Sequence, residues 1–204
     1  MPARFLIVSR FSVHPGKSTD FIAALGHDTD RRVFKAVDHD EVIEIQAIAD
    51  KTNLDEMAAR LNKVSAEYAD YLMADIRREL LDYVEAPKST EGLLPDTPYI
   101  QLRHVEVKPA QMSAYRDWRD NTIFDVVRNS DQVEVFLAYH SVLSGQPGVM
   151  FIAGFSGAID EYVAIFNTDR YKKIVQEAGD QYITGGTDGL YTQIYQDPAD
   201  AVAA

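Results

Sequence analysis

Cysteine is absent from the sequence, and histidine occurs only five times. Without cysteine the chain has no disulfides, no thiolate nucleophile, no iron–sulfur cluster and no cysteine-based zinc site, which leaves histidine and carboxylates as metal ligands. The histidines are scattered, and none forms the i, i+4 pair of a metal-binding helix. The sequence therefore predicts no metal site.

Basic residues are also scarce. The chain has 20 Lys and Arg against 32 Asp and Glu, a net charge of −12. A field of this sign repels phosphate backbones and anionic lipids. No apolar run approaches the roughly 18 residues that a membrane helix needs, and the segment after Met1 lacks a signal-peptide pattern. We expect a cytoplasmic protein whose partners include neither nucleic acid nor a membrane.

The common phosphate-binding and nucleophile motifs are missing. The sequence contains no Gly-x-Gly-x-x-Gly, no Gly-x-x-x-x-Gly-Lys-Ser/Thr and no Gly-x-Ser-x-Gly. The glycine-rich segment 185–189 precedes a predicted strand rather than a helix, so it indicates a turn and not a phosphate cradle. One buried histidine would suffice to hold a haem, but the sequence gives no positive sign of it, and we expect no cofactor.

The composition that remains is globular, with 46% hydrophobic and 25% charged residues over 204 positions. A chain of this length can form one large domain or two small ones. Two stretches match in the same order: an extended run ending in Val-x-Pro occurs at Pro15 and again 94 positions later at Pro109, and a helix start follows at Asp55 and at Asp160. This favours duplication.

The proposed boundaries follow from the same alignment. We expect a first repeat over residues 1–88, a linker over 89–98 that is rich in turn-forming residues, and a second repeat over 99–204.

The second half has clear local patterns. Alternation, helical spacing and turn signals predict, in order, a strand at 99–107, a helix at 110–128, a hairpin of strands 132–143 and 149–155, helices at 159–167 and 170–178, and a strand at 189–196. The first half repeats this order less clearly, with strands at 4–13, 32–37, 41–49 and 80–84, a helix at 18–27 and helices from 54 through 78. Asn53 and Glu56 form the capping box that starts the helical region at 54.

The segment Val-His-Pro-Gly-Lys-Ser-Thr-Asp-Phe at 13–21 leaves a strand through Pro-Gly and enters a helix. With the repeated βαββαβ order over residues 4–196, it resembles the dimeric α/β-barrel superfamily of ferredoxin-like folds, nearest its antibiotic-biosynthesis monooxygenase-like domains. The resemblance implies an α+β protein: two ferredoxin-like βαββαβ repeats whose antiparallel sheets pack as an internal pseudo-dimeric α/β barrel. One four-stranded sheet with helices on one side needs cover on its other face.

The strand at 99–107 carries the first group of candidate site residues. Arg103, His104 and Glu106 put a cation, an imidazole and a carboxylate on one strand, with Gln101 beside them. The alternation of polar and apolar residues inverts at His104, which suggests a β-bulge or a change in what covers the two faces of the strand. The group could be an acid/base pair with an anion clamp, or the end of a strand running into solvent.

His140 lies in a long hydrophobic strand, next to Tyr139, where an imidazole is costly to bury unless it is hydrogen-bonded or used. We therefore select it as the first candidate catalytic histidine, with a hydrogen-bonded or edge-exposed histidine as the alternative. His14, His27 and His39 lie near turns and are assigned to the surface.

The last strand alternates Tyr191, Gln193 and Tyr195 on one face. Facing inward, these side chains would line an aromatic cavity with hydrogen-bonding groups, suited to a planar organic ligand; facing outward, they would be ordinary surface aromatics. Trp118, the only tryptophan, sits within a predicted helix, where it is a ligand contact or a core residue.

These residues suggest a polar cavity bounded by strand 99–107, His140 and strand 191–195. One hypothesis is a cofactor-independent oxygenase or isomerase acting on a small aromatic or polyketide-like molecule, in which His140 or His104 removes a proton and Arg103 stabilises the resulting enolate. The alternative is a non-catalytic protein that binds a small organic ligand. The sequence does not name the substrate, and it leaves a homo-oligomer open.

Overall fold

The computed structural model describes residues 1–26, 28–49 and 53–199. Its strands are β1 (Phe5–Ser12), β2 (Arg31–Ala36), β3 (Glu41–Ile48), β4 (Arg77–Lys88), β5 (Tyr99–Val105), β6 (Val135–Leu143), β7 (Val149–Phe155) and β8 (Leu190–Gln196). Its helices are α1 (Ser18–Leu25), α2 (Leu54–Glu67), α3 (Met112–Asn121), α4 (Ile123–Arg128), α5 (Ile159–Phe166) and α6 (Asp169–Gln181), with 3₁₀ segments at Ala69–Tyr71, Pro109–Gln111 and Gly186–Gly189.

The strands form one closed antiparallel barrel in the order β1-β3-β2-β8-β5-β7-β6-β4. Within it, β4-β1-β3-β2 comes from the first half of the chain and β8-β5-β7-β6 from the second, and each half repeats the other's strand order. The halves meet where β2 pairs with β8 and where β4 pairs with β6. The expected α+β barrel of two ferredoxin-like units is therefore confirmed, while the exact repeat and linker boundaries stay a prediction.

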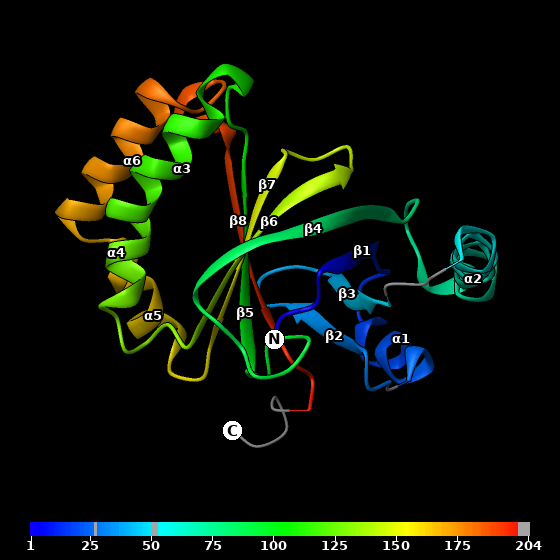
Figure 1. The fold of residues 1–204 in the computed structure, drawn as a ribbon. Helices are drawn as coiled ribbons and strands as arrows, with labels where there is room; N and C mark the ends of the chain where they lie inside the picture. The colour runs from blue at the N-terminus through cyan, green and yellow to red at the C-terminus, as the bar shows by residue number, and fades with distance from the viewer. Residues whose placement is uncertain (27, 50–52, 200–204) are drawn as a thin grey trace.

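Helices cover the barrel on two opposite sides. Figure 1 shows α3, α4, α5 and α6 gathered over the strands of the second half, with α1 and α2 on the other side. An apolar core fills the barrel interior, and separate apolar clusters lie between each sheet and its helices. Strands β5 and β7 are consequently buried on both faces, so a polar residue on either strand is enclosed whichever way it points. None of the helices in the described ranges is long and apolar enough to cross a membrane.

Two helical predictions were too long. The helix expected at 110–128 is interrupted at Thr122, whose backbone leaves the helical region and whose hydroxyl donates to the carbonyl of Trp118 at 2.8 Å. Such a side-chain bond competes with the helix ladder. The helix expected through residue 78 ends at Glu67, and β4 begins three residues before the predicted strand. Asn53 caps the start of α2 as predicted, accepting from the Asp55 amide, but among the described residues no hydrogen bond from the Glu56 side chain completes the expected capping box.

Candidate functional site

Arg103 faces outward from β5, under the helices of the second half. Its guanidinium is hydrogen-bonded to the Tyr171 hydroxyl on α6 and, at 3.1 Å, to Gln101 Oε1. The guanidinium carbon lies 4.7 Å from the ring centroid of Phe166. The side chain is 9% exposed. Gln101 is held in turn by the Tyr162 hydroxyl at 3.0 Å. Arg103 is thus fixed by neutral groups.

A pocket of about 240 Å³ opens beside this guanidinium, between β5, β7, β8 and the helices. Most of its lining is apolar, and its polar members are Arg103, Tyr115, Tyr171 and Thr192. Burial raises the pKa of the Tyr115 phenol well above its ordinary value, so that hydroxyl stays neutral. The pocket therefore combines an apolar wall with one buried cation.

Arg103 forms no ion pair with any carboxylate of the described residues. A buried charge without a counterion is costly, because it gives up its hydration without recovering the energy from an opposite charge. Neutral hydrogen bonds and ring faces offset only part of that cost. The pocket is accordingly poised to accept an anionic group against Arg103, and we take it as the candidate functional site.

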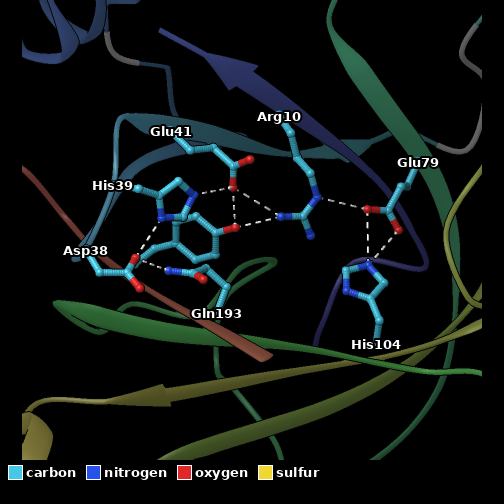
Figure 2. Close-up of polar contacts among 8 residues, drawn as sticks. Arg10, Asp38, His39, Glu41, Glu79, His104 and Gln193 are labelled. Carbon is cyan, nitrogen blue, oxygen red and sulfur yellow. Dashed lines mark hydrogen bonds and ion pairs between the residues drawn. The ribbon is translucent and has the colours of Figure 1, made fainter. Parts of the chain in front are cut away.

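His104 faces the other way, into the barrel. Its Nε2 lies 3.1 and 3.2 Å from the two carboxylate oxygens of Glu79 on β4. Because β5 and β4 are not neighbours in the sheet, this contact crosses the barrel interior. Glu79 also accepts from Arg10 Nε at 3.3 Å. Figure 2 shows the resulting chain of polar contacts, which continues from Arg10 toward the rim of the barrel.

The predicted face of β8 joins this chain. Tyr195 accepts from Arg10 Nη1 and donates to Glu41 Oε1, both at 2.6 Å. Gln193 donates to Asp38 at 2.5 Å. The ring centroid of Tyr191 lies 5.9 Å from that of His104, and its side chain is 46% exposed at the barrel mouth. The inward orientation of the three residues was one of the two expected alternatives, and it is the one observed.

His140 lies apart from both groups of residues. It is on the outer face of β6, half-buried, and lines a separate open groove with Glu85, Arg116 and other residues of α3. Burial and the charges of Arg119 and Arg116 lower its pKa. The expectation that His140 shares a cavity with β5 and β8 is wrong. His140 lines neither the pocket beside Arg103 nor a second hollow, at the mouth of the barrel, that is lined by Tyr191 of β8.

The remaining predicted residues lie elsewhere. Glu106 is exposed just beyond β5. Trp118 packs against Tyr182, with ring centroids 5.1 Å apart, in the helical layer. Tyr139 is buried toward the other end of the barrel, where its hydroxyl donates to the Ala3 carbonyl at 3.0 Å. None of the three lines the pocket beside Arg103.

Among the other histidines, His14 is exposed and His27 lies outside the described residues. His39 is exposed as expected but contacts Asp38 at 2.7 Å, and this hydrogen bond lowers the pKa of Asp38.

Sequence reasoning missed several residues that contact Arg103 or belong to the polar chain of His104. Arg10 lies in a strand read as largely apolar, and Glu79 lies just before the strand predicted at 80–84. The available signal was one charged residue inside an apolar run, which is unusual unless the charge is paired. Tyr171 and Tyr162 carried no signal, because tyrosines in amphipathic helices are common core residues.

The residues present do not fit a haem in the pocket beside Arg103. Haem iron takes a histidine, cysteine, methionine or tyrosine ligand. The lining includes none of the first three, and of its two tyrosines Tyr171 is engaged by Arg103, while burial keeps Tyr115 protonated. Among the described residues, no three histidine or carboxylate side chains gather into a group that could hold a metal ion.

No known protein-family profile matches the chain, and no curated protein matches it. Solved structures do resemble it. An anthrone oxidase-like protein superposes with a TM-score of 0.70 at 12% identity, covering 94% of this chain and 90% of that one. A candidate monooxygenase from Fusobacterium nucleatum gives 0.63 at 15% identity, covering 96% and 93%.

A ferredoxin-fold protein from Listeria monocytogenes, described as related to antibiotic biosynthesis monooxygenases, gives a TM-score of 0.51 at 8% identity, covering 94% of this chain and 95% of that one. At these identities the comparison establishes the fold. The chain has the ferredoxin-like α/β-barrel fold of antibiotic-biosynthesis monooxygenase-like proteins.

Proposed function

We propose that the protein is a small-molecule enzyme of the monooxygenase-like type, which binds an acidic aromatic or polyketide-like substrate as its anion in the pocket beside Arg103. The observation that carries this proposal is a buried guanidinium without a counterion at the wall of an apolar pocket. The fold shared with an anthrone oxidase-like protein supports the substrate class.

The pocket suits a compact planar ligand. An apolar cavity of about 150 Å³ accepts a benzene ring, so about 240 Å³ holds one or two fused rings, and a third ring would project from the open side of the pocket. Phe151 and Phe166 line it and provide aromatic contact surface for a planar ligand. The apolar lining lowers the local polarity beside Arg103, and this strengthens its attraction for a phenolate or enolate oxygen.

Arg103 supplies the electrostatic part of the chemistry. A cation beside the substrate oxygen stabilises the phenolate or enolate relative to the neutral form, and the proton that is lost passes to solvent. The electron-rich anion then reacts with dioxygen: one oxygen atom enters the ring system as a carbonyl, and the other leaves as water with the two hydrogens lost from the carbon. The Tyr171 hydroxyl and Gln101 position the guanidinium. His104 takes no part in this step, because it projects into the barrel interior on the opposite face of β5.

The test uses 1-naphthol and anthrone, whose ionised forms absorb at longer wavelength than the neutral forms. Wild-type protein should bind both and shift each spectrum toward the anion at a pH where the free compound is neutral. Arg103→Met should weaken binding about tenfold or more, because the variant loses one charge-assisted hydrogen bond to the ligand. The matched control is Arg170→Met, because Arg170 is an exposed arginine on α6.

Oxygen uptake separates the two hypotheses. An enzyme should consume dioxygen with anthrone at a rate that Arg103→Met abolishes and Arg170→Met leaves unchanged. Binding that depends on Arg103 without oxygen uptake would instead support the alternative, a non-catalytic ligand-binding protein. Binding that is equal in wild-type and Arg103→Met proteins would contradict both.

A further inference from the structure

A second hollow lies at the mouth of the barrel, on the opposite face of the sheet from the pocket beside Arg103. It measures about 370 Å³. Its polar lining comprises Arg10, Ser12, Glu41, Asp75, Arg77, Gln146 and Tyr191. The proposed function does not use this site.

Two arginines of the hollow stand directly opposite each other. Arg10 on β1 pairs in register with Arg77 on β4, so both side chains leave the same face of the sheet. Partners in register on antiparallel strands have Cα atoms about 5 Å apart. Like charges in such a pair destabilise a sheet unless something between them carries the opposite charge.

The two arginines differ in how far the protein neutralises them. Arg10 is 6% exposed and held by Glu79 and Glu41. Burial disfavours its charge, but Tyr195, Glu79 and Glu41 outweigh that effect and raise its pKa. Its Nη2 is buried and has no hydrogen-bond partner among the described residues. Figure 2 shows this nitrogen free of any contact while the other two are engaged.

Arg77 is exposed at the mouth, and its side chain forms no ion pair or hydrogen bond with any other described residue. Two arginines paired across two strands thus line the hollow, one with a buried unpaired N–H group and one with an unpaired guanidinium. A carboxylate fits between two such groups, because the free guanidinium of Arg77 can offer it two parallel hydrogen bonds and Arg10 can add one from Nη2. Glu79 and Tyr195 keep Arg10 in position for this contact.

Two carboxylates line the same hollow, Glu41 and Asp75. They disfavour a ligand with several negative charges and favour one that brings hydroxyl or ammonium donors. We propose that the barrel mouth binds a small carboxylate with a neighbouring hydroxyl or amino group, the carboxylate between Arg10 and Arg77 and the donor toward Glu41 or Asp75. This site is independent of the pocket beside Arg103.

The experiment compares three probes of nearly equal size by isothermal titration calorimetry and by amide chemical shifts. Lactate has a carboxylate with a neighbouring hydroxyl, propionate has only the carboxylate, and propane-1,2-diol has only hydroxyls. Lactate should bind most tightly, propionate several-fold more weakly, and the diol not detectably. Shifts on addition of lactate should centre on residues of β1, β4 and β8 at the barrel mouth.

Arg77→Gln should weaken lactate binding about tenfold, and because Arg77 is exposed the variant should fold normally. Arg60 is an exposed arginine on α2, and the control variant Arg60→Gln should bind lactate as wild type does. Arg103→Met should also retain lactate binding, so that failure here and failure of the proposed function remain distinct. The proposal is overturned if the diol binds as tightly as lactate, or if Arg77→Gln binds lactate as well as wild type does.

Discussion

Arg103 and His104 are consecutive residues of β5, yet they serve separate centres on opposite sides of the barrel wall. Arg103 is hydrogen-bonded to Tyr171 in the helical layer, whereas His104 contacts Glu79 across the barrel interior. Strand pleating imposes this separation, because successive side chains point to opposite faces. An acid–base mechanism that uses both residues on one substrate is therefore excluded, and the two centres can be tested independently.

The unpaired charge of Arg103 leads to a prediction about stability. Replacing a buried charge with an apolar side chain of similar volume is often neutral or stabilising. We expect Arg103→Met to match or exceed the wild-type free energy of unfolding in urea, even as ligand binding is lost. A loss of about 3 kcal/mol or more would show that Arg103 is needed for the fold rather than retained for a ligand.

Glu79 should behave in the opposite way. Its carboxylate is buried and shared by Arg10 and His104. Glu79→Gln removes the negative charge and leaves Arg10 with only the more distant Glu41, so we expect a loss of about 2 kcal/mol or more in urea denaturation. Glu134→Gln, at an exposed position, should change stability by less than about 0.5 kcal/mol. Equal effects for the two variants would contradict the described role of Glu79.

The pKa of His140 leads to a prediction about pH. Burial and the nearby Arg119 and Arg116 lower this pKa in the folded state, so the unfolded chain binds the proton more tightly. Stability from this residue is present above the ordinary pKa of about 6.5 and is lost as pH falls through the window below it.

Wild-type protein should therefore lose stability more steeply than His140→Gln between pH 7.5 and pH 5.5, measured by urea denaturation. A proton NMR titration should place the pKa of His140 below the ordinary histidine value of about 6.5. A pKa of His140 above that value would contradict the prediction.

The order of elements could be predicted because its signals are local. The strand expected at 149–155 coincides with β7, and the Gly/Pro turn before it joins β6 and β7 as a hairpin. Periodicity and turn residues act over a few positions, so one sequence carries them.

The arrangement of polar residues was harder to predict. The inversion of pattern at His104 suggested either a bulge or a change in what covers the strand, and the continuous register of β5 with β7 and β8 rules out the bulge. The pattern inverts because both faces of β5 are buried, one by the barrel core and one by helices, so polarity does not mark a face. Arg10 and Glu79 are 69 positions apart, and no local pattern reveals such a contact.

Gly189 leads to a prediction about how β8 supports the pocket. A Cβ added there would lie 2.3 Å from the Thr184 carbonyl oxygen and 2.5 Å from Ile183 Cγ2, so backbone would have to move. Gly189 directly precedes Leu190, which lines the pocket beside Arg103. Gly189→Ala should cost about 1–3 kcal/mol of stability and should also weaken 1-naphthol binding.

Gly148→Ala is the matched control, because nothing lies within 4 Å of an added Cβ there. Its free energy of unfolding should equal that of wild type or rise slightly, since alanine restricts the unfolded chain. Naphthol binding should be unchanged, because Gly148 does not line the pocket. If Gly189→Ala proves as stable as Gly148→Ala, the close approach of the 184–189 turn to the start of β8 is not a feature of the folded protein. If it loses stability but binds naphthol normally, the pocket does not depend on the position of Leu190.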